Sequence, residues 1–201
     1  DPKNREEQEA YIRQMEPDGN VPAGKDVVHP KAGYVVKTHK TDKDKKPEKV
    51  WVNIVHHEKV DEPTFEATER DGVKGTAWRL PHSPGPPRLE KDKRDSVVTT
   101  FDCCFHPRAV AMTLPGGAAR DTARLREVLV NTALEAVENG ARAQGQPNYT
   151  LDREFHVLKG VDYKVGAQPQ TMLFPKNPAP VEVESRGGAG AKGAAAKAHA
   201  A

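Results

Sequence analysis

The sequence contains little cysteine, and this limits how its fold can be stabilised. Only two of its 201 residues are cysteines, and these are the neighbours Cys103 and Cys104. A disulfide between adjacent residues closes no useful loop and strains the backbone, so a disulfide-stapled scaffold is excluded. Unpaired cysteines are typical of a reducing compartment, and we therefore expect a cytoplasmic protein.

Long apolar runs and an excess of charge of one sign are also missing. No stretch approaches the roughly 18 apolar residues that a membrane-spanning helix needs, so no membrane contact is expected. The 31 basic and 29 acidic side chains leave a formal charge of +2, too small for the broad basic surface of a duplex-binding protein. Aromatic residues make up only 5% of the chain and are not interleaved with the lysines, which argues against nucleic acid binding by a basic loop.

What is present suffices for one folded domain with extended ends. Hydrophobic residues are 36% of the chain, charged residues are 30%, and 17 prolines interrupt regular structure. We expect an N-terminal helical extension over residues 1–26 and the folded domain over residues 27–166. Residues 167–201 are first Pro-rich and then Gly/Ala-rich, which predicts a disordered linker.

Short runs of β-branched and aromatic residues predict a sheet. Val50–Val55 is apolar on both faces apart from Asn53, and we expect it to be the central strand. Val97–Phe105 is the other strong strand, and its odd-numbered side chains are expected to face the core. Further short strands are expected at 27–28, 34–36 and 77–80, with a loop at 39–48 and a long irregular excursion at 56–76.

Helical periodicity is strongest over Thr122–Asn139. Its apolar residues repeat at spacings of three and four, and Gly140 stands where a helix-ending glycine is expected. A second short helix is expected at about Asp152–Lys159. Together these elements predict an α+β fold, in which a mixed or antiparallel β-sheet is packed by a long helix and short helices.

Four residues could support a metal-dependent hydrolase, namely His57, Asp102, Cys104 and His106. Thiolates and imidazoles are the usual zinc ligands. Neighbouring strand residues point to opposite faces, however, so Cys103 and Cys104 cannot share one ion without a bulge. No third group is marked that would orient Cys104 and His106 as nucleophile and base. We therefore expect no catalytic residue, no metal and no cofactor.

Lysine is concentrated in one short segment. From Lys37 to Lys49 there are six lysines and three acids, a local balance of +3. If the strands that contain Lys37 and Lys49 pair antiparallel, these two residues flank the loop mouth with backbones about 5 Å apart. Ammonium groups held that close repel each other, and a phosphate or clustered carboxylates between them would reverse this cost. The alternative is a solvated loop whose lysines only keep the protein soluble.

Seven short motifs occur in order along the chain. They are Gly-Tyr-Val-Val-Lys-Thr at 33–38, Lys-Val-Trp-Val-Asn-Ile at 49–54, Trp-Arg-Leu-Pro at 78–81, Phe-Asp-Cys-Cys-Phe-His-Pro at 101–107, Thr-Ala-Leu-Glu-Ala-Val-Glu at 132–138, Leu-Asp-Arg at 151–153 and Leu-Lys-Gly at 158–160. This succession resembles the PIH domain, which is named for proteins interacting with heat-shock protein 90. The opening Asp-Pro-Lys-Asn-Arg and the Val28-His29-Pro30 step are most similar to the branch of the family that preassembles axonemal dynein arms in the cytoplasm.

The resemblance implies a co-chaperone adaptor without enzymatic activity. In a related member two lysines bind phosphorylated serine in an acidic motif, and these lysines correspond to Lys37 and Lys49, with Lys159 near the same surface. The implied partners are the heat-shock protein 90 or 70 chaperone machinery, dynein heavy or intermediate chain clients, and acidic or phosphorylated protein segments. The alternative within the family is an adaptor for other multisubunit complexes, such as small nucleolar ribonucleoproteins.

Overall fold

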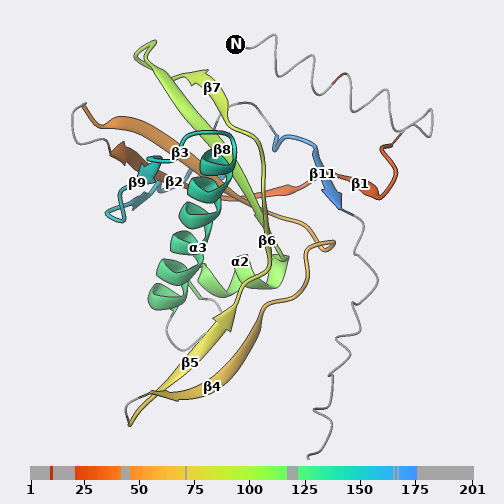
Figure 1. The fold of residues 1–201 in the computed structure, drawn as a ribbon, viewed down its shortest axis with the longest axis vertical. Helices are drawn as coiled ribbons and strands as arrows, with labels where there is room; N and C mark the ends of the chain where they lie inside the picture. Colours follow the sequence, from red (N-terminus) through yellow and green to blue (C-terminus); the bar gives the residue numbers. More distant parts are fainter. Residues whose placement is uncertain are drawn as a thin grey trace, which may run out of the picture.

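A mixed β-sheet with helices on one face forms the body of the protein (Figure 1). The computed structural model describes residues 10, 21–41, 46–70, 72–116, 122–164, 166 and 168–175. Ala10 is helical, but the other residues from 1 to 20, which contain most of the predicted N-terminal extension, lie outside the described residues. Beyond Pro175 the predicted linker lies outside them as well.

The main sheet is built around long strands from the middle of the chain. Its strands are β2 (Lys31–Thr41), β3 (Glu48–His56), β6 (His82–Pro84), β7 (Arg88–Lys91), β8 (Val97–Phe105), β9 (Thr150–Leu151) and β10 (His156–Val157). Within the described residues the order is β10-β2-β3-β8-β6, with β9 also paired to β2 and β7 also paired to β8. β2 and β3 are antiparallel, whereas β3 and β8 are parallel, so the sheet is mixed.

β3 is the central strand that its sequence predicts. All of its residues from Val50 to Val55 are buried, because β2 and β8 flank it and side chains cover both of its faces. β8 has the predicted bounds. The loop predicted at 39–48 is wrong at both ends, because Lys40 pairs with Glu48 in the ladder and only residues 42–47 remain between the strands.

The predicted long helix is confirmed as α3 (Thr122–Ala143), which covers one face of the sheet (Figure 1). It passes through Gly140, so the predicted stop there is wrong. The helix ends instead before Gly145, whose φ of 86° is the left-handed conformation typical of a helix end. No helix in the described ranges is both long enough and apolar enough to cross a bilayer.

A second helix, α2 (Pro107–Thr113), follows β8 directly and was missed by the sequence pattern. Proline at the first helical position loses no hydrogen bond, and its ring presets the helical backbone angle. His106 precedes it, and its Nδ1 accepts a hydrogen bond from Arg108 N at 3.2 Å, as a capping side chain does. Pro107 therefore ends the strand region and begins a helix in one step.

The principal hydrophobic core lies between the sheet and α3. On β8 the odd-numbered Phe101, Cys103 and Phe105 belong to it, which confirms the predicted facing at these positions. α3 contributes Leu129, Val130, Ala133, Leu134, Ala136 and Val137. The even-numbered Val98 and Cys104 are buried in smaller clusters away from α3. The sheet is therefore covered on both faces.

The region 56–76, which was expected to be irregular, contains most of a hairpin. β4 (Thr64–Arg70) and β5 (Val73–Arg79) pair antiparallel over their whole length and project from the main sheet (Figure 1). Phe65 and Trp78 stack across the hairpin with ring centroids 5.3 Å apart. Nearly every side chain of β4 is exposed, so this strand carries none of the apolar alternation that marks a strand in a sequence.

The short helix predicted at 152–159 is wrong. The backbone of this region bonds to β2 and forms the short strands β9 and β10 instead. Asp152 N donates to His39 O and Leu158 N donates to Val35 O, each at 2.9 Å. Because these amide groups are satisfied by a neighbouring strand, the segment has no need of helical hydrogen bonds.

The folded domain also continues past its predicted end at Gly166. β1 (Lys25–Val28) pairs antiparallel with β11 (Met172–Pro175) in a separate two-stranded sheet. Val28 and Phe174 are buried together in one apolar cluster. The pairing of β1 with β11 explains why the predicted end at Gly166 was too early, since β11 is too short to be recognised in the sequence without its partner strand.

A buried carboxylate fastens the end of α3 to β9. Glu138 accepts hydrogen bonds from Leu151 N at 2.7 Å and from both Nη atoms of Arg153 at 2.9 and 3.0 Å. Burial alone raises the pKa of the Glu138 carboxyl, but the bonds from Arg153 and Leu151 outweigh it, so that this pKa lies below its usual value. Two of the sequence motifs, those on α3 and at β9, thus meet in one ion-pair network.

Truncation of Phe101 tests the face of β8. This side chain is 4% exposed and belongs to the α3 core, so Phe101→Ala should lower the free energy of unfolding by about 3–5 kcal/mol. Denaturant titration followed by circular dichroism measures the loss. Phe65→Ala is the matched control, because Phe65 is 60% exposed and its truncation should cost much less. Equal losses in the two variants would contradict the core assignment.

Glu138 should make stability depend on pH. A carboxyl whose pKa is lower in the folded state stabilises the fold above its unfolded pKa of about 4.3, and this contribution is lost as the pH falls through the folded-state pKa. Glu138→Gln should lower the unfolding free energy by about 1–3 kcal/mol at neutral pH, and the deficit should shrink on acidification through that range. Glu135→Gln, at an exposed position of the same helix, is the control. A deficit independent of pH would contradict this role.

Candidate functional site

Lys37 and Lys49 lie on the face of the sheet that is turned away from α3. In the β2–β3 register Lys37 stands opposite Trp51 and His39 stands opposite Lys49, and residues two apart on a strand point the same way. The two lysines are therefore diagonal neighbours, for which a separation of about 7–8 Å is typical. The predicted placement across the loop mouth at about 5 Å is wrong, because β2 continues four residues beyond Lys37, to Thr41.

The Trp51 ring lies beneath two ammonium groups. Lys49 Nζ is 5.8 Å and Lys164 Nζ is 4.9 Å from the ring centroid, both within the range of cation–π attraction. Trp51 is itself 5% exposed, packed with Val35 and Val98 on this face. The buried ring therefore contacts two ammonium groups, those of Lys49 and Lys164, which come from distant parts of the chain.

Lys164 was not predicted to belong to this surface. Asn53 fixes the position of its backbone. Asn53 Oδ1 accepts from Lys164 N at 2.9 Å, while Asn53 Nδ2 donates to Lys164 O at 3.1 Å and to Asp102 Oδ1 at 2.8 Å. A buried amide in the centre of an apolar strand needs such partners, because an unsatisfied polar group there is costly. The isolated asparagine in Val50–Val55 was thus the signal that another segment covers this strand.

Lys49 already has an acidic partner. Its ammonium group forms an ion pair with Asp92, in the turn between β7 and β8. Asp92 Oδ1 accepts from Arg94 N at 2.8 Å and from Ser96 N at 3.1 Å, which fixes the carboxylate in place. The hydrogen bond from Lys49 lowers the pKa of Asp92 to about 2, so the carboxylate is charged at neutral pH. The positive charge of Lys49 is therefore partly compensated, which the sequence did not predict.

Within the part of the chain that the structure describes, the other lysines of this face have no acidic partner. Lys37 is half-buried and stands between His156 of β10 and Trp51 of β3 in the ladder. Lys159 is exposed in a turn whose flanking Leu158 packs on the Trp51 cluster. No carboxylate among the described residues forms an ion pair with either lysine or with Lys164.

We call this surface the lysine face, and its members are Lys37, Lys49, Lys159 and Lys164 around Trp51. It combines ammonium groups from β2, β3 and the segment that follows β10. Such a surface can hold a multivalent anion, since charge-assisted hydrogen bonds to phosphate or carboxylate are the strong ones in proteins. The ammonium groups are hydrogen-bond donors only, so an anion with several acceptor oxygens is the ligand that fits them.

The residues of the hydrolase alternative have other tasks in the fold. Asp102 is paired with Arg88, His57 Nδ1 accepts from Lys59 N at 3.1 Å, and His106 caps α2. Burial raises the pKa of the Cys104 thiol to about 12, which keeps it protonated and unreactive. Among the described residues, no three His, Cys, Asp or Glu side chains are grouped so that they could hold a metal ion.

Comparisons with known proteins identify related chains. Protein kintoun of Drosophila mojavensis is 31% identical over 187 residues, which are 92% of this chain and 19% of that protein. Protein kintoun of Drosophila persimilis is 32% identical over 187 residues, 92% of this chain and 20% of that protein. The chain thus spans about a fifth of the length of these relatives.

A solved structure and a family model match most of the chain. The N-terminal domain of yeast PIH1p superposes with a TM-score of 0.55 at 22% identity, covering 75% of this chain and 92% of that one, which supports the fold. The model of the PIH1 N-terminal domain matches residues 1–179. Since this match takes in far more than half of the sequence, the chain belongs to the PIH1 N-terminal domain family.

Proposed function

We propose that this domain is a non-enzymatic co-chaperone adaptor that binds acidic or phosphorylated segments of client proteins on the lysine face. The observation that carries the proposal is the meeting of Lys49 and Lys164 over the buried Trp51 ring, with Lys37 diagonally adjacent. The backbones of Lys37 and Lys49 are fixed in the β2–β3 ladder and that of Lys164 is fixed by Asn53, so less freedom is lost when an anion binds. Such preorganisation is what distinguishes a binding site from scattered surface lysines.

Electrostatics favours phosphate over a single carboxylate. A phosphoserine carries a charge of about −1.5 to −2 and three acceptor oxygens, so it can contact more than one lysine at once. Lys49 makes one charge-assisted hydrogen bond to Asp92, whereas a phosphate can accept such bonds from several lysines at once, each contributing about 1.5–3 kcal/mol. A phosphate can therefore draw Lys49 away from Asp92, and acidic residues beside it can reach the exposed Lys159.

The biological setting of this adaptor follows from the relatives. By its resemblance to the kintoun branch, we propose that the protein acts in the cytoplasm in the preassembly of axonemal dynein arms. Its partners would be dynein heavy or intermediate chain clients and the heat-shock protein 90 or 70 chaperone machinery. The alternative is an adaptor for other multisubunit complexes, such as small nucleolar ribonucleoproteins, and affinity purification of the full-length protein from ciliated cells would distinguish the two.

Charge reversal at Lys37 tests the lysine face. Lys37→Glu should reduce the affinity for a peptide with phosphoserine in an acidic context at least tenfold, and Lys164→Glu should act in the same direction. The unfolding free energy of Lys37→Glu should change by no more than about 0.5 kcal/mol, as for other surface substitutions. Isothermal titration calorimetry with the phosphorylated and unmodified peptides measures the affinities.

Lys74→Glu is the matched control, because Lys74 is exposed on the hairpin β4–β5, a structure separate from the main sheet. It changes the net charge of the protein by the same amount, so any general electrostatic effect appears in it as well. If Lys37→Glu and Lys74→Glu weakened binding equally, the anion would not be bound at the lysine face. Equal affinities for phosphorylated and unmodified peptide would remove phosphate from the proposal and leave only acidic segments.

Asp92 should compete with the ligand for Lys49. Asp92→Asn keeps an oxygen that can accept from Arg94 N and Ser96 N but removes the negative charge beside Lys49. The variant should bind the phosphopeptide up to about fivefold more tightly, because Lys49 no longer has to leave a carboxylate when the phosphate binds. Titration at low and high salt measures this gain, which should be smaller at high salt. Unchanged or weaker binding at low salt would show that Lys49 is not used.

A further inference from the structure

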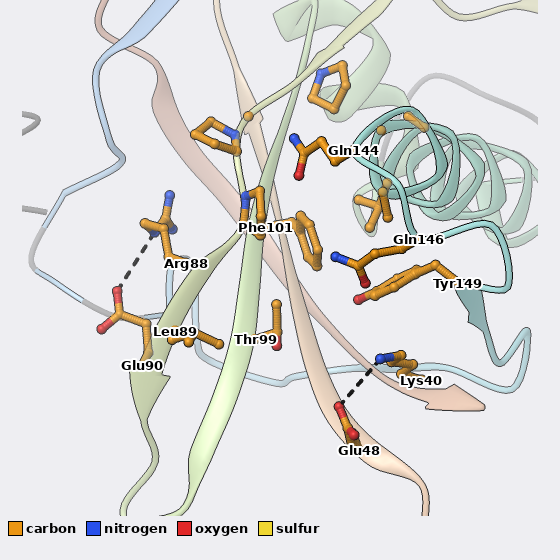
Figure 2. Close-up of a pocket in the computed structure, with 18 residues that line it drawn as sticks. Lys40, Glu48, Arg88, Leu89, Glu90, Thr99, Phe101, Gln144, Gln146 and Tyr149 are labelled. Atoms are coloured by element: carbon orange, nitrogen blue, oxygen red, sulfur yellow. Dashed lines mark ion pairs between the residues drawn. The ribbon is translucent and has the colours of Figure 1, made fainter. Parts of the chain in front are cut away.

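A cavity of about 660 Å³ opens on the helical face of the sheet (Figure 2). Its walls come from the C-terminal half of α3, from the segment 84–90 and from β8. Phe101 and Tyr149 line its interior with ring centroids 6.2 Å apart in an edge-to-face arrangement. The volume is within the roughly 300–1,000 Å³ of ordinary ligand sites. None of the four lysines of the lysine face lines it.

The interior of the cavity is apolar. Phe101, Ala136 and Val137 line it, and none of them is more than 7% exposed. The opposite wall is the proline-rich segment 84–87. Proline has no backbone N–H, so this wall cannot pair with an added strand through a regular ladder. A ligand would therefore be recognised by insertion of an apolar group and not by strand addition.

The hydroxyl oxygen of Tyr149, a lining residue that is 6% exposed, is itself buried and has no hydrogen-bond partner among the described residues. Figure 2 shows its hydroxyl end directed from the α3 side toward β8, with Gln146 beside it. Burial raises the pKa of Tyr149 to about 12, so the group stays a hydroxyl donor at neutral pH. A buried hydroxyl without a partner is costly, and a ligand that brings an acceptor would remove this cost.

The charged side chains at the rim are already compensated. Lys40 Nζ lies 3.8 Å from Glu48 Oε2 and 5.1 Å from the Tyr149 ring centroid. Figure 2 marks this ion pair and shows the Arg88 and Glu90 side chains directed away from the cavity, to the other side of β7 from Leu89. With Glu48 beside a cation, the charged part of the rim on this face favours an uncharged ligand, in contrast to the acidic segments proposed for the lysine face.

The apolar surface continues outside the cavity along β7 and β8. Leu89 and Val97 are 59% and 66% exposed, although both are large apolar side chains. Leu89 pairs with Thr99 in the ladder, and Val97 is two residues from Thr99, so both lie on the face that carries the cavity. Exposed apolar surface that adjoins a pocket usually marks a contact with another molecule. A strand rises about 3.3 Å per residue, so Val97 lies roughly 7 Å along β8 from Thr99, and an extended stretch of polypeptide can reach from the cavity to it.

We propose that this cavity is a second docking site, which binds an uncharged apolar segment of a partner polypeptide. One leucine-like or aromatic side chain of the segment enters between α3 and β8. The Tyr149 hydroxyl donates a hydrogen bond to a carbonyl oxygen of the segment, and Leu89 and Val97 contact the residues that follow. Gln146 is exposed beside Tyr149, so a change in its side-chain torsions opens the hydroxyl to the ligand.

The test uses a defined peptide and the protein labelled for NMR. The probe is the blocked heptapeptide acetyl-Gly-Ser-Leu-Gly-Leu-Ser-Gly-amide, and the comparator carries aspartate in place of both leucines. The leucine peptide should cause saturable shifts of the amide signals of Thr99, Phe101 and Val137, while the signal of Lys37 stays in place. The aspartate peptide should cause none of these shifts.

Four variants distinguish binding in the cavity from nonspecific apolar binding. Gly140 lines the cavity, an added Cβ there would meet no atom within 4 Å, and leucine favours helix, so Gly140→Leu should fold and abolish the shifts. Glu135→Leu, at an exposed position of α3 outside the cavity, is its control and should retain them. Tyr149→Phe removes only the hydroxyl and should weaken binding about three- to tenfold. Lys37→Glu should bind the leucine peptide like the parent, which separates this site from the lysine face.

Several outcomes would overturn the proposal. The absence of shifts with the leucine peptide, or shifts that persist in Gly140→Leu, would show that the cavity is not the docking site. Binding of p-cresol without binding of the peptide would assign the cavity to a small molecule. A dimer of the parent protein that Gly140→Leu abolishes would assign it to a second copy of this chain.

Discussion

The buried ion pair between Arg88 and Asp102 is the interaction on which the face of the sheet turned away from α3 depends. Arg88 donates from Nη1 and Nη2 to the two carboxylate oxygens of Asp102 at 3.0 and 2.8 Å, and both residues are buried. Gln170 accepts from Arg88 at 2.7 Å, and Tyr163 donates to Asp102 at 2.8 Å. Loss of one member of such a pair leaves an uncompensated buried charge, at a typical cost of about 3–5 kcal/mol. The pair thereby joins β7, β8 and the C-terminal segment.

The same network positions the lysine face. Asp102 accepts a hydrogen bond from Asn53, which in turn holds the backbone of Lys164 on both sides. The ammonium group of Lys164 reaches Trp51 because this backbone is fixed, and not because of any contact of its own with the network. The proposed binding surface and the fold are therefore coupled through one buried carboxylate, Asp102. Asn53 and Asp102, which belong to the PIH motifs, influence the lysine face through buried hydrogen bonds.

β3 separates two surfaces of different chemistry by the alternation of its side chains. Glu48 lines the apolar cavity, whereas the next residue, Lys49, lies over Trp51 on the opposite face. Each surface is completed by a different part of the chain, α3 for the cavity and the segment after β10 for the lysine face. One short domain can thus offer a charged site and an apolar site together. This arrangement suits an adaptor that must hold more than one feature of a partner.

Local sequence pattern determined some of the elements, while long-range contacts decided the others and the composition of the lysine face. Local apolar pattern predicts the bounds of β8, the existence of α3 and the central place of β3. This pattern depends only on residues that are close together in the sequence. Local charge in the sequence also marked Lys37 and Lys49 as candidate site residues. The sequence could not show that Lys49 pairs with Asp92, 43 residues away, or that Asn53 holds Lys164, 111 residues away. Such partners are chosen by the packing of the whole sheet, and no local pattern records them, so only the tertiary structure decided which lysines share a surface.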